Sequence, residues 1–265
     1  MTARPYPPIY FVVGTDTAVG KTEVTCALLR SLRARGRHAL AYKPAMSGDE
    51  QPDDLVRLIE ATIPIRTADP ELPTPTRHSS CAYFFDRPIA PGVADARAVF
   101  IGAAEVDPAA HAAALARVDA HFEAFLAQHQ PKIVFVEGAG GLHVPMPGGA
   151  WLPDWLAHWQ QRYGSRCLVV ARAGLGTLNH TIATFEGLAA RSLDCAGFLV
   201  SDLPRPDVAA ADPSVSDNIA ILEHRLGQPC LGRLRHLSFE QRGAPLEATS
   251  WLNDAWFERI GTPAR

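Results

Sequence analysis

The chain has 265 residues, and its 47% hydrophobic content is sufficient for one large α/β domain or two small ones. Its formal charge of −3 and its lack of a Lys/Arg-rich block argue against nucleic-acid and membrane-surface partners. No apolar run reaches the length of a membrane span and the first residues lack a signal-peptide pattern, so we expect a cytoplasmic protein. Five cysteines without C-x-x-C spacing fit a reducing compartment and argue against disulfides and zinc.

A glycine-containing loop follows the first strong apolar segment, residues 9–13, which predicts a buried strand. The loop reads Gly14-Thr15-Asp16-Thr17-Ala18-Val19-Gly20-Lys21-Thr22. A helical pattern follows at 23–35. In this context backbone N–H groups and the helix N-terminus face phosphate oxygens, Lys21 reaches the β- and γ-phosphates, and the Thr22 hydroxyl binds Mg²⁺. The segment predicts a nucleoside triphosphate site, and the alternative of a chance turn is disfavoured because the motif stands at a strand-to-helix junction.

Residues 38–43 predict a second strand, which we expect to end at Pro44. Lys43 and Ser47 lie at the end of this strand, and ligands of doubly wound sheets bind at the carboxyl ends of the strands. Lys43 is therefore either part of the phosphate site or an ordinary exposed lysine, and its position alone does not decide between the two.

The next segment carries an acidic cluster at 49–54, which leads into a short helix at 55–59. These carboxylates either form a solvated helix start or supply one ligand for Mg²⁺. Four prolines in residues 62–75 predict a surface excursion. Aromatic residues at 81–86 then indicate a strand that feeds a Pro-x-x-Pro turn at 88–91.

The middle of the chain predicts a long amphipathic helix over 103–128 and a buried strand over 132–136. Glu137 ends that strand, and Gly138, Ala139, Gly140 and Gly141 follow. A carboxylate at a strand end beside glycines is a typical ligand position for Mg²⁺ or its water in a phosphate-loop protein. We favour that interpretation over a plain turn.

The last third continues the alternation of strands and helices. Tryptophans at 151, 155 and 159 recur at helical spacing, which indicates core or subunit contact. A second glycine loop, residues 174–180, opens a helix and forms a second possible anion site. Strands are predicted at 167–171, 195–200 and 230–232, and helices at 181–191, at 216–226 and in the C-terminal tail.

This order predicts a single P-loop α/β domain over residues 1–265, with a doubly wound, mostly parallel sheet flanked by helices, of the P-loop NTPase type. No composition shift marks a boundary and no repeat is visible. All candidate groups fall at carboxyl ends of strands, so they can converge at one edge of the sheet.

Four blocks in the same order resemble the dethiobiotin synthetases over nearly the whole chain. They are the loop from Gly14 to Thr22, the segment from Lys43 to Gly48, residues 136–141, and the segment from Gly174 to Thr181. The resemblance implies an ATP-dependent cyclo-ligase of biotin biosynthesis that converts 7,8-diaminopelargonic acid, CO₂ and ATP into dethiobiotin. A substrate amine captures CO₂, the carbamate takes the γ-phosphoryl group, and the second amine displaces phosphate.

The resemblance also implies roles for individual residues. Lys21 and Lys43 would stabilise γ-phosphate and carbamate oxygens, and Thr17 would lie near the nucleotide and the substrate amines. Ser47 would contact the carbamate. The implied Mg²⁺ ligands are Thr22, Asp54 and Glu137, and ATP would be the co-substrate. The implied nucleotide contacts are the loop Gly14–Thr22 together with Glu137, Gly138, Gly140, Ser201 and Asp202.

The family is a homodimer, and its substrate lies across the subunit interface. The resemblance places the substrate beside Gly138, Ala139 and Gly140 of one chain. Its carboxylate would bind the partner's helix start at Gly176, Thr177, Leu178 and Asn179. Ser201 replaces the asparagine that reads adenine in the family, so a rotatable hydroxyl at a solvent-open position should select ATP over other nucleotides by roughly tenfold or less.

Two other classes share the phosphate loop. A partitioning-type ATPase switch would carry a further lysine early in the loop, and residues 14–20 contain none. A P-loop amide ligase acting on a small carboxylic acid would need a glutaminase domain, for which the chain is short. An inactive paralogue is the third alternative. Dependence of phosphate release on both diaminopelargonic acid and bicarbonate distinguishes the ligase from all of them.

Overall fold

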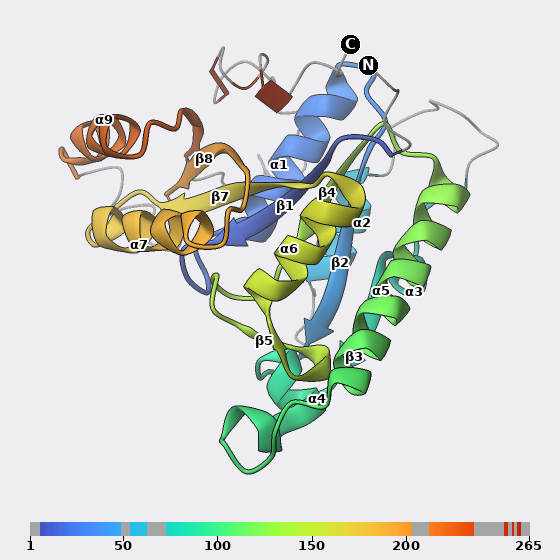
Figure 1. The fold of residues 1–265 in the computed structure, drawn as a ribbon. Coiled ribbons are helices and arrows are strands. Elements are labelled where there is room, and N and C mark those ends of the chain that lie inside the picture. Colours follow the sequence, from blue (N-terminus) through green and yellow to red (C-terminus); the bar gives the residue numbers. More distant parts are fainter. Residues whose placement is uncertain are drawn as a thin grey trace.

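The computed structural model describes residues 6–48, 54–62, 73–202 and 212–235, together with 252, 253, 256, 259 and 260. Seven strands form one sheet in the order β3-β2-β4-β1-β7-β8-β9, and all neighbouring pairs are parallel (Figure 1). The strands are β1 (Ile9–Gly14), β2 (Ala39–Ser47), β3 (Cys81–Phe85), β4 (Ile133–Glu137), β7 (Arg166–Arg172), β8 (Cys195–Ser201) and β9 (Cys230–Leu234).

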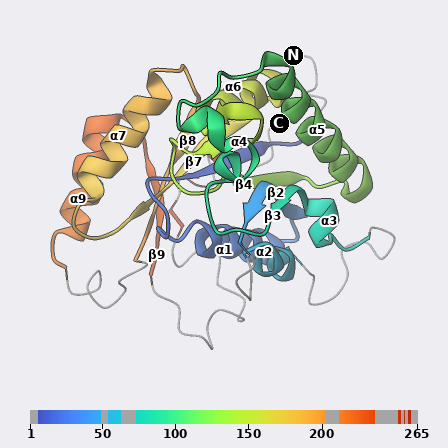
Figure 2. The same ribbon diagram turned by 90° about the horizontal axis from the view of Figure 1, so that it is seen from below.

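Helices cover both faces of this sheet (Figure 2). One face packs on α1 (Lys21–Ala34) and α2 (Asp54–Thr62). The other face packs on α5 (Pro108–His129), α6 (Leu152–Tyr163), α7 (Thr177–Ala189) and α9 (Val215–Leu226). Strands enclosed on both sides read as continuous apolar runs, and β1 is buried at every position. The predicted doubly wound α/β fold is therefore confirmed.

Short elements complete the described chain. They are α3 (Arg77–Ser80), α4 (Pro91–Phe100), β5 (Pro145–Met146), the 3₁₀ helix η1 (Pro147–Gly149) and β6 (Ala150–Trp151). β5 and β6 form an antiparallel pair beside α4. In the described chain no helix is both long enough and apolar enough to cross a membrane.

Aromatic side chains fill the core between the sheet and α5 and α6. The ring centroid of Phe122 lies 4.5 Å from that of Trp159 and 4.9 Å from that of Tyr42. Trp155 and Trp159 are fully buried, which confirms their expected place in the core. Trp151 is 42% exposed and packs edge-on against Phe100, so the core does not include it.

Differences from the sequence prediction concern β2, the long helix and the segment after β3. β2 does not end at Pro44 but continues to Ser47. Its pairing with β4 ends at Tyr42 while pairing with β3 runs on to Ser47, so the missing proline N–H removes no hydrogen bond with β4. The long helix begins at Pro108 instead of 103, because the Asp107 side chain accepts the Ala109 N–H and caps it.

The third difference is α4, a helix that starts at Pro91 where the sequence indicated only a turn. Proline suits the first helical position because its missing N–H has no partner there in any case. The excursion predicted from residue 62 lies outside the described residues at 63–72, and the expected C-terminal helix lies largely outside them.

Candidate active site

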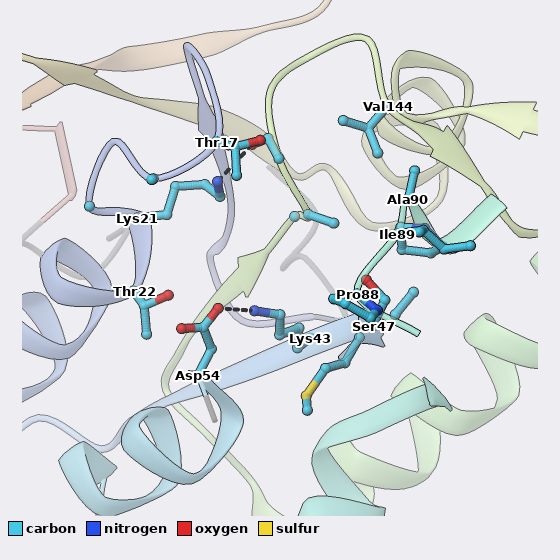
Figure 3. A pocket seen from close by; sticks show the side chains of 18 of the residues that line it. Thr17, Lys21, Thr22, Lys43, Ser47, Asp54, Pro88, Ile89, Ala90 and Val144 are labelled. Carbon is cyan, nitrogen blue, oxygen red and sulfur yellow. Dashed lines mark hydrogen bonds and ion pairs between the residues drawn. The ribbon is translucent and has the colours of Figure 1, made fainter. Parts of the chain in front are cut away.

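A cavity of about 630 Å³ lies at the carboxyl ends of the central strands (Figure 3). The phosphate loop, the ends of β2 and β4, the start of α2 and the segment between β3 and α4 all contribute to its wall. The predicted site residues on this wall are Thr17, Ala18, Gly20, Lys21, Thr22, Lys43, Ser47, Asp54, Gly138, Ala139 and Gly140. The structure thus brings three of the four sequence blocks together.

The phosphate loop has the local geometry of an anion site. Gly20 has a φ of 90°, a left-handed conformation, directly before α1. No side chain in the described chain caps α1, so the first N–H groups of the helix are left for a ligand. A Cβ at Gly14 would lie 2.7 Å from the Asp16 carbonyl oxygen, so the close return of the loop requires glycine there.

Two lysines bring positive charge to the cavity. Lys21 Nζ donates to the Gly140 carbonyl oxygen at 2.7 Å. Burial lowers the pKa of Lys21, and the charge of Lys43 adds to this effect while that of Glu137 opposes it. Burial also disfavours the charge on Lys43, but Glu137 and Asp54 outweigh it and hold the pKa of Lys43 above its usual value. Lys43 is therefore cationic at neutral pH.

Glu137 is the centre of a buried polar cluster and is itself fully buried. Its Oε1 accepts the Thr22 hydroxyl at 2.9 Å and the Lys43 ammonium at 3.0 Å. Lys43 also donates to Asp54 Oδ2 at 2.8 Å. Burial alone would raise the pKa of Asp54, but Lys43 outweighs it and lowers that pKa. Residues from α1, β2, α2 and β4 thus form one charged network.

The donor set of this cluster fits Mg²⁺. Glu137 Oε2 is buried and has no hydrogen-bond partner among the described residues, which leaves one carboxylate oxygen available. The Thr22 hydroxyl and the Asp54 carboxylate lie in the same network. Mg²⁺ typically takes one or two carboxylates and completes its octahedron with phosphates and water. Within the described chain no group of three or more His, Cys, Asp or Glu side chains could hold a metal ion, so a Mg²⁺ ion here would need phosphate or water ligands as well.

The opposite wall of the cavity is apolar, and the sequence analysis did not identify it. Figure 3 shows Pro88, Ile89, Ala90 and Val144 facing the lysines across the cavity. Met46 and Pro91 also line the cavity. The sequence did contain a signal for this wall, because residues 88–91 follow β3 and ligands of parallel sheets bind beyond the carboxyl ends of the strands.

Glu23 and Arg57 are two further residues on the wall that the sequence analysis did not identify. Their side chains form an ion pair between α1 and α2. Glu23 follows Thr22, and Arg57 lies one helical turn after Asp54. The pair therefore ties together the two helices that carry predicted Mg²⁺ ligands.

Ser201 and Asp202 do not line the cavity. Ser201 is fully buried at the end of β8, so the expected rotatable hydroxyl at a solvent-open position is wrong. The reason is local packing, since the Ser201 carbonyl accepts the Ala173 N–H at 2.8 Å and β9 covers the strand on its other side. Asp202 is 3% exposed and forms an ion pair with Arg233.

The remaining predicted residues lie behind or away from the cavity wall. Val19 is buried in the core, which leaves only its backbone for a nucleotide. Thr15 and Asp16 belong to the loop but do not line the cavity. The segment Gly176–Asn179 forms the start of α7 and also stands apart from the cavity of its own chain.

The fold and the site define a P-loop nucleotide-binding protein. A family model described as an AAA domain matches residues 9–239. The ATP-dependent dethiobiotin synthetase BioD of Anaeromyxobacter sp. (strain K) is 42% identical over 220 residues, which cover 81% of this chain and 85% of that protein. The protein of the same name from Aromatoleum aromaticum is 34% identical over 232 residues, covering 88% and 92%. The chain belongs to the dethiobiotin synthetase family.

A solved structure gives the same fold at greater distance. The signal recognition particle receptor FtsY from Elizabethkingia anophelis matches with a TM-score of 0.52 and 11% sequence identity. The match covers 95% of this chain and 63% of that one. A likeness of this kind supports the α/β architecture and nothing about the reaction.

Proposed function

We propose that this protein is an ATP-dependent dethiobiotin synthetase, which closes the ureido ring of dethiobiotin from 7,8-diaminopelargonic acid and CO₂. The observation that carries the proposal is one cavity with a phosphate loop and two lysines on one wall and an apolar surface on the other. A nucleotide and an aliphatic diamine need these two chemistries side by side. Relatives of the same name at 42% and 34% identity support it.

The proposed reaction requires charge neutralisation and alignment, and no protein nucleophile. The first amine adds to CO₂ and forms a carbamate, whose oxygen attacks the γ-phosphorus while ADP leaves. The second amine then attacks the carbamoyl carbon, and phosphate leaves as the ring closes. Lys21 and Lys43 supply positive charge where the transferred group becomes more negative. Neither cysteine nor histidine is among the described lining residues, which agrees with direct transfer.

The substrate amines must be neutral to react. Cations near an amine disfavour its ammonium form, and Lys21 and Lys43 provide such cations in the cavity. Low polarity acts in the same direction, and the wall at Pro88, Ile89 and Ala90 provides it. Thr17 and Ser47 remain to hold the amine and the carbamate by hydrogen bonds. Mg²⁺, when bound, supplies charge stabilisation on the β- and γ-phosphates, with Thr22, Asp54 and Glu137 as its protein ligands.

The proposal includes a homodimer. The start of α7 has no side-chain cap among the described residues, and it presents the Gly176 and Leu178 N–H groups and the exposed Asn179 away from the cavity of its own chain, while the Thr177 N–H donates to the Gly174 carbonyl oxygen at 3.2 Å. A second copy can bring these groups to the substrate carboxylate, as the family resemblance implies. Leu175 beside them is 93% exposed, which is unusual for leucine and suits an interface position.

We further propose a single domain working in the cytoplasm. The single-domain proposal is supported by the one sheet that joins strands from β1 to β9. The five cysteines are free thiols, which suits a reducing compartment.

The test measures phosphate release with and without diaminopelargonic acid and bicarbonate, and product formation by mass spectrometry. A dethiobiotin synthetase releases phosphate only with both substrates and makes one dethiobiotin for each phosphate. A switch ATPase would hydrolyse ATP without either substrate. Phosphate release that ignores bicarbonate would contradict the proposal.

A further inference from the structure

The carboxylate of Asp16 lies in the phosphate loop but not on the cavity wall. Its Oδ1 accepts the backbone N–H of Thr17 at 2.7 Å. Its Oδ2 accepts from the guanidinium of Arg172 at 2.7 Å. The Asp16 side chain therefore links the backbone of the loop to Arg172.

Arg172 reaches the loop from a different part of the sheet. It is the last residue of β7, which pairs with β1 up to the register of Gly14 with Val170. The Thr15 N–H also donates to the Val170 carbonyl at 3.0 Å. The Arg172 side chain is only 27% exposed, and its Nε is buried without a partner among the described residues. The Arg172 guanidinium thus lies where the phosphate loop leaves β1.

The loop needs such support because its backbone is strained. Ala18 has a φ of 57°, a left-handed conformation that is unfavourable for a residue with a Cβ. Such residues persist where neighbouring contacts determine the conformation. The bond from Thr17 N–H to Asp16 immediately precedes Ala18, and Arg172 fixes the carboxylate that accepts it.

We propose that Arg172 is a positioning residue for the phosphate loop and acts on nucleotide binding through Asp16. An ion pair of this exposure contributes little to global stability. Its effect falls on the loop, because a loop that leaves the phosphate-binding conformation must regain it when the nucleotide binds. Loss of the pair therefore weakens nucleotide binding without unfolding the protein.

The test uses two variants. Arg172→Met keeps much of the side-chain length and removes the charge, and Arg172→Lys keeps the positive charge but lacks the planar guanidinium group. The control is Arg191→Met, because Arg191 forms a comparable ion pair with Asp154 at 2.6 Å, far from the loop. Equilibrium binding of ATP and ADP to each protein is measured without diaminopelargonic acid, together with thermal unfolding. The binding result therefore does not depend on whether the protein makes dethiobiotin.

We expect Arg172→Met to raise the dissociation constant for ATP by about tenfold, as for loss of one charge-assisted contact. Arg172→Lys should recover part of this loss, and Arg191→Met should bind as the wild type does. In turnover, KM for ATP should rise while kcat changes by less than about threefold. Binding by Arg172→Met within twofold of wild type would overturn the proposal.

A double-mutant cycle tests whether Arg172 acts through Asp16. Asp16→Asn alone should weaken ATP binding to a similar degree, and the double variant Asp16→Asn with Arg172→Met should be little weaker than either single variant. Effects that simply add would show that the two residues act separately and would contradict the mechanism.

Discussion

Two glycine loops in this molecule open helices in nearly the same way. Gly20 before α1 has a φ of 90° and Gly176 before α7 has a φ of 88°. Both loops follow buried parallel strands, β1 and β7, and neither helix has a side-chain cap among the described residues. By backbone geometry alone, each is an anion site.

Their surroundings differ. The first loop carries Lys21 and lies beside Lys43 on the wall of a cavity, and Lys43 is paired with the buried Glu137 behind that wall. The second carries the exposed Leu175 and has no lysine beside it in the sequence. The comparison teaches that a helix N-terminus provides donors, while the neighbouring side chains determine which anion binds. The first suits a triphosphate with its metal, and the second suits a single carboxylate.

The largest effect should come from removing the cation of the first loop. Lys21→Ala should weaken ATP binding by at least about a hundredfold, because a buried charge facing the phosphates is lost. Lys132→Ala is the matched control, since Lys132 is exposed and only its backbone bonds within the described chain. Isothermal titration with ATP distinguishes the two. If Lys21→Ala bound ATP as tightly as the wild type, the side chains around the first loop would not distinguish it from the second, and the comparison of the two loops would be wrong.

Substitution of Lys43, which lies on β2 beside the first loop, tests whether this site promotes phosphoryl transfer as well as nucleotide binding. Lys43→Ala should lower kcat by on the order of 10²–10³, with a smaller change in ATP affinity, since its charge is needed in the transition state. Lys43→Gln is a second variant that keeps a hydrogen-bond donor near the buried Glu137 and guards against loss of folding. Turnover of either folded variant within threefold of wild type would remove the proposed role.

The second loop should matter only in a dimer. Leu175→Glu places a charge at the proposed interface, so it should shift the protein toward the monomer and raise KM for diaminopelargonic acid by at least about tenfold while ATP still binds. Ile221→Glu is the control, as Ile221 is 47% exposed on α9. Size-exclusion chromatography and kinetics over a dilution series give the readout. A fully active monomer would contradict the dimer proposal.

The smallest effect concerns Ser201, which supports the root of the second loop through its carbonyl. Because the residue is fully buried, Ser201→Asn should reduce the free energy of unfolding by about 1–3 kcal/mol through overpacking. It should not sharpen the preference for ATP over GTP or CTP. Denaturant unfolding and kcat/KM for the three nucleotides provide the check. A rise in ATP preference at unchanged stability would restore Ser201 as a base-reading residue.

Sequence alone predicted which charged groups of the candidate site lie together, because simple rules place them. A glycine loop between strand and helix places Lys21 and Thr22 on the cavity wall, and the ends of parallel strands bring Lys43 and Glu137 within hydrogen-bond distance. Burial was harder to predict. Ser201 reads as a loop residue, yet β9 and the loop at Ala173 cover it.

Other features depended on contacts between distant residues. The pair of Arg172 with Asp16 joins positions that no local pattern connects. The wall at 88–91 consists of apolar residues that look like ordinary loop or core side chains until the cavity is seen. The start of α5 was misplaced because alanine-rich sequence favours helix on both sides of Asp107, and only the cap at Asp107 decides.

Pro44 has a consequence for how the protein behaves among other chains. Beyond Tyr42, β2 has lost its neighbour β4 but keeps β3, so this part of the strand, although mostly buried, has a sheet neighbour on one side only. Open edges attract further strands, by which proteins add peptides or aggregate. A proline at the first position of this edge cannot donate a backbone hydrogen bond, so an incoming strand cannot begin a regular ladder there. The proline that does not end the strand thus disfavours strand addition beside Lys43 and Ser47, which both lie on the cavity wall.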